Sequence, residues 1–141
     1  MAADHKQLEA QMEKVAPAEV AQGLSEFWSQ QTIGSANGSL FKVAKGIGST
    51  NWHTHEDQEE TFLILSGQLT IRLRSGNVQL SEGDLFIIPR GVEHCPVADE
   101  EAHFLLIGPD VTSNAAGGKP DWSYAQPSDT HGTDEAIGAS G

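Results

Sequence analysis

Two histidines one residue apart, followed by a glutamate, form the part of the sequence best suited to chemistry. They are His53 and His55 in the stretch GSTNWHTHEDQEETFLILSG, and Glu60 opens its apolar run. Alternate side chains of a β-strand point to the same face, so the two imidazoles can face one centre. A chain reversal after His55 would bring Glu60 beside them. Imidazoles and a carboxylate held together are typical ligands of first-row transition metals.

A third histidine completes this candidate metal site. His94 follows Gly67 by 27 residues in GDLFIIPRGVEHCPV, where turn residues between apolar runs predict another strand–turn–strand unit. Three imidazoles and one carboxylate can hold a divalent metal and leave positions open for water or substrate. The set contains nitrogen and oxygen but no thiolate, which suits Mn, Fe, Ni, Co or Zn without selecting one of them. The predicted ligands are His53, His55, Glu60 and His94.

The same two stretches resemble the two signature motifs of the cupin superfamily. The first motif is a glycine, HxH, three or four residues, a glutamate, six residues and a glycine. The second is a glycine, five residues, PxG, two residues and a histidine. The residues that match are His53, His55, Glu60 and Gly67, then Gly83, Pro89, Gly91 and His94. Glu56 and Glu59 are alternative carboxylates, but only Glu60 keeps the six-residue spacing to Gly67.

Two positions depart from these motifs. Gly48 lies one residue closer to His53 than the family pattern has it, and Ala98 stands where the pattern has an asparagine. Neither position supplies a metal ligand in the family, so the resemblance still implies the metal site. From about Phe27 to Asn114 the chain is similar to small single-domain cupins labelled mannose-6-phosphate isomerase-like. The resemblance therefore implies an all-β, cupin-type double-stranded β-helix (jelly-roll) barrel.

The residue pattern of the central part independently favours an all-β sandwich or barrel. Short apolar or alternating segments are separated by turn residues every 8 to 12 positions. The expected strands cover residues 39–45, 61–66, 68–74, 77–80, 84–89, 92–97 and 102–108. In 68–74 we expect Leu69, Ile71 and Leu73 to face inward, and Arg72 and Arg74 outward. The acidic run 99–101 is expected to be a solvated loop.

Three parts are expected along the chain: a helical appendage over 1–26, the barrel domain over 27–111 and a Gly/Ser/Asp-rich tail over 112–141. Within residues 4–15, Leu8, Met12 and Val15 have the spacing of a short amphipathic helix that Pro17 would end. Residues 18–31 stay open between helix and strand. Trp122 and Tyr124 are an aromatic pair in an otherwise polar tail and are candidates for docking on the barrel or on a second subunit.

Alternation also predicts which side chains line the pocket. Those expected at the metal side are Asn51, Phe62, Ile64 and His103. For His103, a hydrogen-bonded structural role is the alternative. Trp52 and Cys95 alternate with metal histidines, so both are expected to point away from the metal. Lys42, Lys45 and Arg90 remain unplaced.

Composition limits the kinds of partner. The chain has 141 residues, a net charge of −12 and one cysteine, which predicts one domain without an internal disulfide. Such acidity argues against nucleic acid and anionic membranes, since both attract clustered Lys and Arg. The sequence shows no run of about 20 apolar residues and no secretory signal at its start. We therefore expect a cytoplasmic protein with a small-molecule ligand, no nucleic acid and no membrane.

The sequence leaves three functions in order of preference. The first is a metal-dependent enzyme that binds a small oxo- or hydroxy-acid directly to the metal, with decarboxylase, lyase, isomerase or dioxygenase chemistry all compatible. The alternative is a non-catalytic protein that binds a metal or a small metabolite. The third is a sugar-phosphate isomerase. Apolar residues on both faces of 61–66 predict, in addition, a homodimer.

Overall fold

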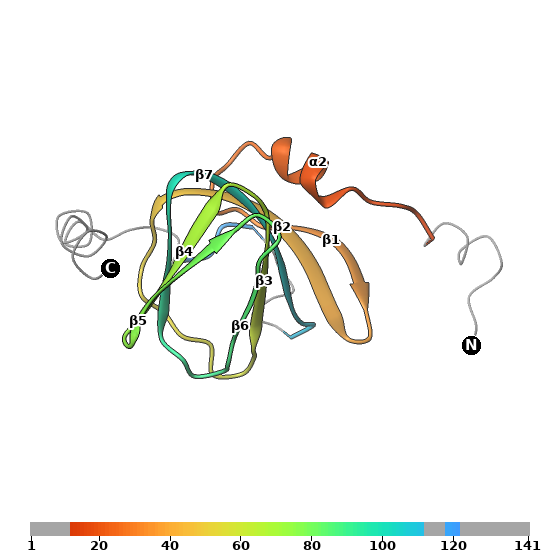
Figure 1. Cartoon of the computed structure of the whole chain (residues 1–141). Helices are drawn as coiled ribbons and strands as arrows, with labels where there is room; N and C mark the ends of the chain where they lie inside the picture. The colour runs from red at the N-terminus through yellow and green to blue at the C-terminus, as the bar shows by residue number, and fades with distance from the viewer. Residues whose placement is uncertain (1–11, 112–117, 122–141) are drawn as a thin grey trace.

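The computed structural model describes residues 12–111 and 118–121, which form an antiparallel barrel with one short helix packed on its outside (Figure 1). The helix is α2 (Pro17–Gln22). The strands are β1 (Gln31–Ala36), β2 (Ser39–Ser49), β3 (Glu60–Ser66), β4 (Gln68–Leu73), β5 (Gly76–Ser81), β6 (Leu85–Ile88) and β7 (His94–Pro109). Every pairing between these strands is antiparallel. The expected all-β jelly-roll fold is confirmed. No helix within the described ranges has the length and apolar content needed to cross a bilayer.

The long strand β7 connects the two sides of the barrel. Its first residues pair with β4, its later residues pair with β3, and β2 runs beside it from Val97 to Pro109. The strand order is β1-β2-β7-β3-β6, with β4 joined to β7 and to β5. Two separate strands, over 92–97 and 102–108, had been expected where β7 runs without a break. Residues 99–101 are exposed as predicted, but they continue β7 instead of forming a loop, because a register shift between Gly46 and Gly48 lets the paired strands bend.

Two apolar clusters lie on opposite faces of the barrel wall. The inner cluster contains Trp28, Ala44, Phe62, Ile64, Leu69, Ile71, Leu80, Ile88, Ala98, Ala102, Phe104 and Leu106. The outer cluster is built on Ala21, Val43 and Leu105, with Val20, Leu24, Ile33, Phe41, Leu63, Leu65 and Ile107 packed against it. The helix α2 therefore covers part of the outer wall. This arrangement explains why β3 is apolar on both faces: alternate residues belong to different clusters.

Pro17 begins a helix instead of ending one. Residues 12–16 are not helical, so the predicted helix over 4–15 is wrong where the structure describes it, and residues 1–11, with Leu8, lie outside the described part. Proline suits the first position of α2 because its φ is already helical and no partner for an N–H is needed there. The open segment 18–31 divides into the rest of this helix and an irregular stretch that ends at β1.

Trp28 joins that irregular stretch to the barrel interior. Its backbone has a φ of 67°, its N–H donates to the Lys45 carbonyl at 2.6 Å, and its indole N–H donates to the Ile47 carbonyl at 3.0 Å. The ring packs against Phe104 with centroids 5.9 Å apart. A Cβ at Gly46 would lie 2.6 Å from the Trp28 ring, so only glycine fits below the indole.

We expect Gly46→Ala to lower the free energy of unfolding by about 1–3 kcal/mol, because the buried ring must move to admit the methyl group. Urea unfolding measures the effect. Gly34→Ala in β1 is the matched control, since a Cβ there meets nothing within 4 Å. Equal stabilities of the two variants would contradict this packing.

Candidate metal centre

The two motif segments hold each other through backbone hydrogen bonds. His53 and His94 exchange N–H···O bonds of 2.9 Å in both directions, and the Gly91 N–H donates to the His55 carbonyl at 2.8 Å. The segment around His53 and His55 lies between β2 and β3 in the chain. It forms a single isolated bridge, from His53 to His94 of β7, and not the regular strand that the sequence suggested. The single bridge still fixes the offset of the two imidazoles relative to His94.

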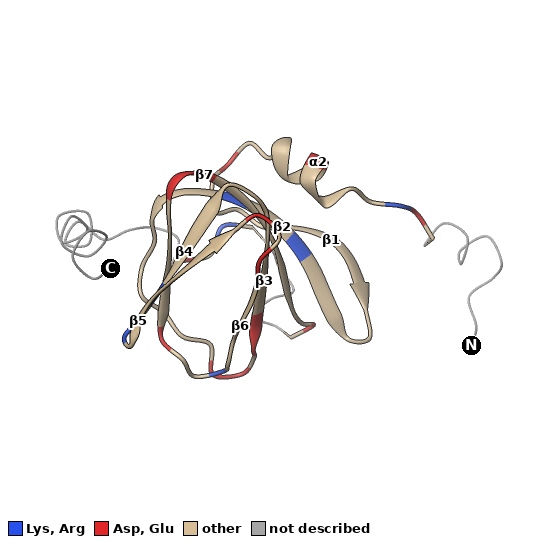
Figure 2. Ribbon diagram, viewed as in Figure 1, with Lys and Arg blue, Asp and Glu red and all other residues tan. Residues whose placement is uncertain are grey.

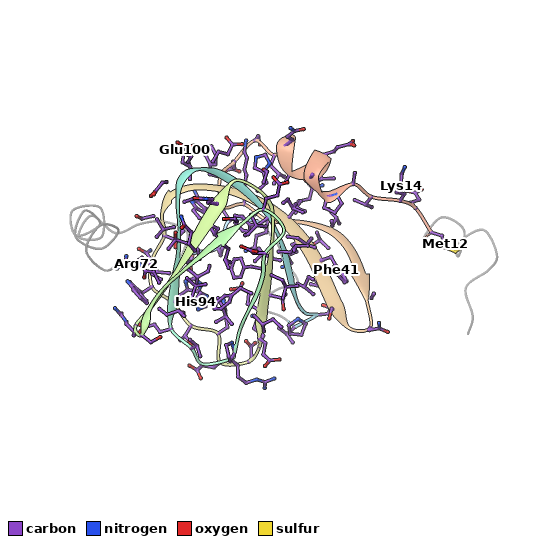
Figure 3. All side chains as sticks on the ribbon, viewed as in Figure 1. Met12, Lys14, Phe41, Arg72, His94 and Glu100 are labelled. Atoms are coloured by element: carbon purple, nitrogen blue, oxygen red, sulfur yellow. The ribbon has the colours of Figure 1, made fainter. Side chains whose placement is uncertain are left out.

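The four predicted ligands come together inside the barrel. One donor atom from each of His53, His55, Glu60 and His94 lies within 4.8 Å of all the others. The rings of His53 and His94 are 4.2 Å apart at their centroids, and those of His53 and His55 are 5.0 Å apart. His94 lies within the barrel outline in Figure 3 and is 1% exposed. This spacing fits one ion with ligands at about 2.0–2.2 Å.

Backbone carbonyls fix the tautomers of two of the histidines. The Nδ1–H of His53 donates to the Asn51 carbonyl at 2.9 Å, and the Nδ1–H of His94 donates to the Val92 carbonyl at 2.8 Å. A carbonyl oxygen can only accept, so in each neutral ring Nδ1 carries the proton and Nε2 keeps its lone pair. Such a bond on the remote nitrogen is the usual way in which proteins orient a metal-binding imidazole.

The inward-facing nitrogens meet a carboxylate. Nε2 of His94 lies 3.2 Å from Oε1 of Glu60, and Nε2 of His55 lies 3.7 Å from the same oxygen. The latter nitrogen is buried and forms no hydrogen bond with any residue that the structure describes. With Nδ1–H of His94 on the Val92 carbonyl, a neutral His94 ring turns a lone pair toward Oε1 of Glu60, and two lone pairs 3.2 Å apart repel unless a proton or a cation lies between them. The donor set therefore fits a bound cation.

Burial and neighbouring charges set the protonation of this cluster. Burial, reinforced by the charge of His94, lowers the pKa of His53 to about 4, so its imidazole is neutral near pH 7. Burial alone would raise the pKa of Glu60. A protonated His94 donates to this carboxylate through Nε2, and this hydrogen bond, with the positive charge that the three histidines carry when protonated, outweighs burial and holds the pKa of Glu60 below its usual value. A neutral imidazole and an ionised carboxylate are the forms that bind metals.

Comparisons with known proteins agree with this geometry. A family model described as a Cupin domain matches residues 39–108, from the start of β2 almost to the end of β7. The crystal structure of a cupin-2 domain containing protein from Shewanella frigidimarina is 32% identical, with 72% of this chain and 98% of that chain covered at a TM-score of 0.66. This chain belongs to the cupin superfamily.

Two further proteins are similar to this chain at lower sequence identity. YdbB of Bacillus subtilis is 29% identical over 76 residues, which are 53% of this cupin and 67% of that protein. A structure from Neisseria meningitidis is 22% identical, with 70% of this chain and 100% of that chain covered at a TM-score of 0.64. At 22% identity, the likeness to the Neisseria structure concerns the fold alone.

Two of the predicted pocket residues lie on the inner wall of this cupin. Phe62 and Ile64 belong to the inner cluster and follow Glu60 at two-residue steps along β3. Asn51 contributes its carbonyl to His53, as described above.

The side chain of His103 points away from the metal centre. His103 alternates with Ala102 and Phe104, which both belong to the inner cluster, so its ring lies on the outer face of β7. There its Nε2 hydrogen-bonds Glu101 Oε2 at 2.6 Å. The prediction that it lines the pocket is wrong. The alternative, a hydrogen-bonded structural histidine, describes it, and the alternation of the strand sets this orientation.

The residues that alternate with the metal histidines lie outside the lumen, as predicted. Cys95 is 1% exposed and its Sγ–H donates to the Thr50 carbonyl at 3.3 Å. The guanidinium carbon of Arg74 lies 3.6 Å from the centroid of the Trp52 ring, and that of Arg72 lies 4.9 Å from it. Arg72 is on the outer face, but it is buried at 8% exposure because it packs in this group.

Sequence reasoning missed one ionisable residue of the inner wall. Lys42 is 4% exposed and shares the face of β2 with Ala44, whereas Phe41 and Val43 contribute to the outer cluster. The alternation in SLFKVAK contained this signal. Both faces of the segment carry apolar residues, however, so the sequence did not show which face is the inner one.

Proposed function

We propose that this protein is a metal-dependent cupin enzyme. A divalent metal is held by His53, His55, Glu60 and His94, and a small oxo- or hydroxy-acid binds to it through its oxygens in the barrel lumen. The observation that supports this most directly is the convergence of the four donor atoms within 4.8 Å of one another, with Nε2 of His94 and of His55 at 3.2 and 3.7 Å from the Glu60 carboxylate. A non-catalytic metal or metabolite binder is the alternative.

The residues of the chain have distinct tasks in this proposal. When bound, the metal acts as a Lewis acid that stabilises negative charge developing on substrate oxygens. The carbonyls of Asn51 and Val92 orient two of the imidazoles through their Nδ1–H groups. Glu60 supplies negative charge and is not the general base, because a cation beside a carboxylate lowers its pKa. Phe62 and Ile64 exclude bulk water and so strengthen charge interactions in the lumen.

A screen of small oxo-acids for loss of absorbance tests the enzymatic proposal, with the protein reconstituted with Mn²⁺, Fe²⁺, Ni²⁺ or Zn²⁺. We expect the rate to depend strongly on the metal. His103→Gln, loaded with the best metal, should keep its rate within about twofold, since His103 lies on the outer face. Equal rates with every metal, combined with a loss of about 100-fold in His103→Gln, would assign the chemistry to a protein acid–base residue instead. No turnover with any metal, alongside tight acid binding, would favour the binder.

We also propose that the chain forms a homodimer through the outer face of β6. Leu85 and Ile87 are 56% and 51% exposed there, and they pair in register with Leu63 and Thr61 of β3. Adjacent apolar side chains on an edge strand usually mark an interface. The outer face of β3 is partly covered by the cluster around α2, so the surface left for a partner is smaller than the sequence suggested.

Sedimentation at micromolar concentration is expected to give twice the mass of one chain. The double substitution Leu85→Asp and Ile87→Asp should give a single-chain mass with an unchanged fold. Ile47→Asp is the control, because Ile47 is 42% exposed on β2, a different strand. A wild-type protein that sediments as a single chain would exclude the dimer.

A further inference from the structure

The segment that carries His53 and His55 has few backbone hydrogen bonds to hold it in place. Its strand-like contact is the bridge in which His53 and His94 exchange N–H···O bonds of 2.9 Å. The Gly91 N–H adds a bond of 2.8 Å to the His55 carbonyl. A segment with so few backbone bonds opens locally more easily than a strand paired along its length. Contacts of its side chains therefore help to decide where the two imidazoles lie.

Three side chains join the two motif segments on the outer face of the barrel. The guanidinium carbon of Arg74 lies 3.6 Å from the centroid of the Trp52 ring, and its Nε–H donates to Oε1 of Glu93 at 2.8 Å. Trp52 immediately precedes His53, and Glu93 immediately precedes His94. Figure 2 shows a basic position at the tip of the β4–β5 hairpin beside the acidic position that precedes β7. These three side chains are called the outer group below.

An arginine is suited to make both contacts of the outer group at once. Its planar guanidinium stacks on an aromatic ring through its face and donates hydrogen bonds through its edge. The strand before Arg74 fixes its position, since Leu73 of β4 pairs in register with His94 of β7. Arg72 lies 4.9 Å from the same ring and is buried at 8% exposure. The outer group therefore lies directly behind the bridge that joins the two histidine-bearing segments.

A surface ion pair without consequence for the site is the simplest alternative explanation. Arg74 and Glu93 are 62% and 47% exposed, and exposed pairs usually contribute little to global stability. Two observations argue for a local role. The guanidinium of this pair also contacts an aromatic ring, and both of its partners are covalent neighbours of residues whose donor atoms converge inside the barrel. A contact with little effect on global unfolding can still limit the local opening of one segment.

We propose that Trp52, Arg74 and Glu93 are positioning residues of the metal centre. Their contacts on the outer face keep His53 and His94 in register inside the barrel. This inference rests on the metal centre of the proposed function, but on no particular reaction there. Loss of the outer group lets the segment of His53 and His55 open more often. Two imidazoles then leave their places together, so a bound metal is released faster.

Amide hydrogen exchange of the metal-free, full-length protein tests the positioning without any metal. The reporter is the His53 N–H, which donates to the His94 carbonyl. The reference is the Ile64 N–H, which donates to the Asp84 carbonyl at 3.0 Å. In Arg74→Ala we expect the His53 amide to exchange about five- to tenfold faster, and the Ile64 amide to keep its wild-type rate.

Variants of Trp52 test the aromatic contact in the same experiment. Trp52→Leu should accelerate exchange of the His53 amide as Arg74→Ala does, after correction for the intrinsic rate. Trp52→Phe keeps an aromatic face for the guanidinium and should restore most of the protection. The double variant Trp52→Leu, Arg74→Ala should exchange no faster than about twice either single variant, because the two side chains act through one contact.

Release of Zn²⁺ to an excess of chelator measures the consequence for the metal. Arg74→Ala should release Zn²⁺ about five- to tenfold faster than wild type. Arg90→Ala is the matched control, because it removes an exposed arginine from the turn before Glu93 but leaves the outer group intact. It should keep the wild-type values for both the release of Zn²⁺ and the exchange of the His53 amide.

Three results would overturn the positioning role. They are unchanged His53 exchange in Arg74→Ala and Trp52→Leu, equal acceleration at His53 and Ile64, and an equal effect of Arg90→Ala. Full Zn²⁺ occupancy with the same release rate in wild type and Arg74→Ala would also contradict this role, and would leave the metal centre standing. Wild type without stoichiometric Zn²⁺ would contradict the metal centre itself and, with it, the inference.

Discussion

His55→Ala is expected to lower the affinity for Zn²⁺ by at least about 100-fold. The substitution removes one of three imidazoles from the cluster, including the nitrogen that lies 3.7 Å from Oε1 of Glu60. The side chain of His55 is 19% exposed, so its loss opens little apolar packing and should leave the fold intact. Competition of tag-free protein with a coloured zinc chelator measures the affinity directly.

His103→Ala is the control for this experiment, because it also removes a histidine but one that bonds Glu101 on the outer face of β7. Its affinity for Zn²⁺ should equal that of wild type. Undiminished zinc binding by His55→Ala would remove His55 from the site. Equal losses in both variants would show that the effect is general destabilisation and not ligand removal.

Phe62→Ala is expected to lower the free energy of unfolding by about 3–5 kcal/mol. Phe62 is fully buried in the inner cluster, and its ring lies 5.8 Å from that of Phe104 between centroids. Truncation to alanine would leave a cavity that β3 and β7 cannot close, since both strands are held by pairing on each side. Urea unfolding in the presence of a metal chelator gives this value without the contribution of metal binding to stability.

Leu63→Ala is the matched comparison on the adjacent position of the same strand. Leu63 is half-buried on the outer face, where its surroundings can relax toward solvent. We expect Leu63→Ala to lower the free energy of unfolding by much less than Phe62→Ala does. A larger loss in Leu63→Ala would mean that the main core lies between the barrel and α2 instead of in the lumen.

The metal cluster could be predicted from the sequence because each of the two motifs sets the positions of its ligands through short-range spacing. A two-residue step from His53 to His55 preserves their common direction, and the PxG turn before His94 determines where the second motif folds back. Neither requirement depends on distant contacts. The four donor atoms consequently lie together even though the first histidine segment has only one bridge in place of the expected strand.

Other features depended on contacts that the sequence does not display. Packing between the lumen and α2 determines which face of β2 points inward, so the sequence did not show that Lys42 lies on the inner face. The direction of His103 follows from the unbroken course of β7, which the acidic run 99–101 concealed. Pro17 is compatible with both the end and the start of a helix, and the packing of α2 on the barrel decides between them. Trp122 and Tyr124 lie outside the described residues, so their docking stays a prediction.

X-ray absorption at the zinc edge tests the metal centre most directly, on tag-free, full-length protein loaded with one equivalent of Zn²⁺. The account predicts nitrogen and oxygen neighbours at about 2.0–2.2 Å, with outer-shell scattering from three imidazole rings. Cys95 is buried and donates to Thr50, so no sulfur should be seen. A sulfur neighbour at about 2.3 Å, or scattering from fewer than two imidazoles, would contradict a centre built from His53, His55, Glu60 and His94.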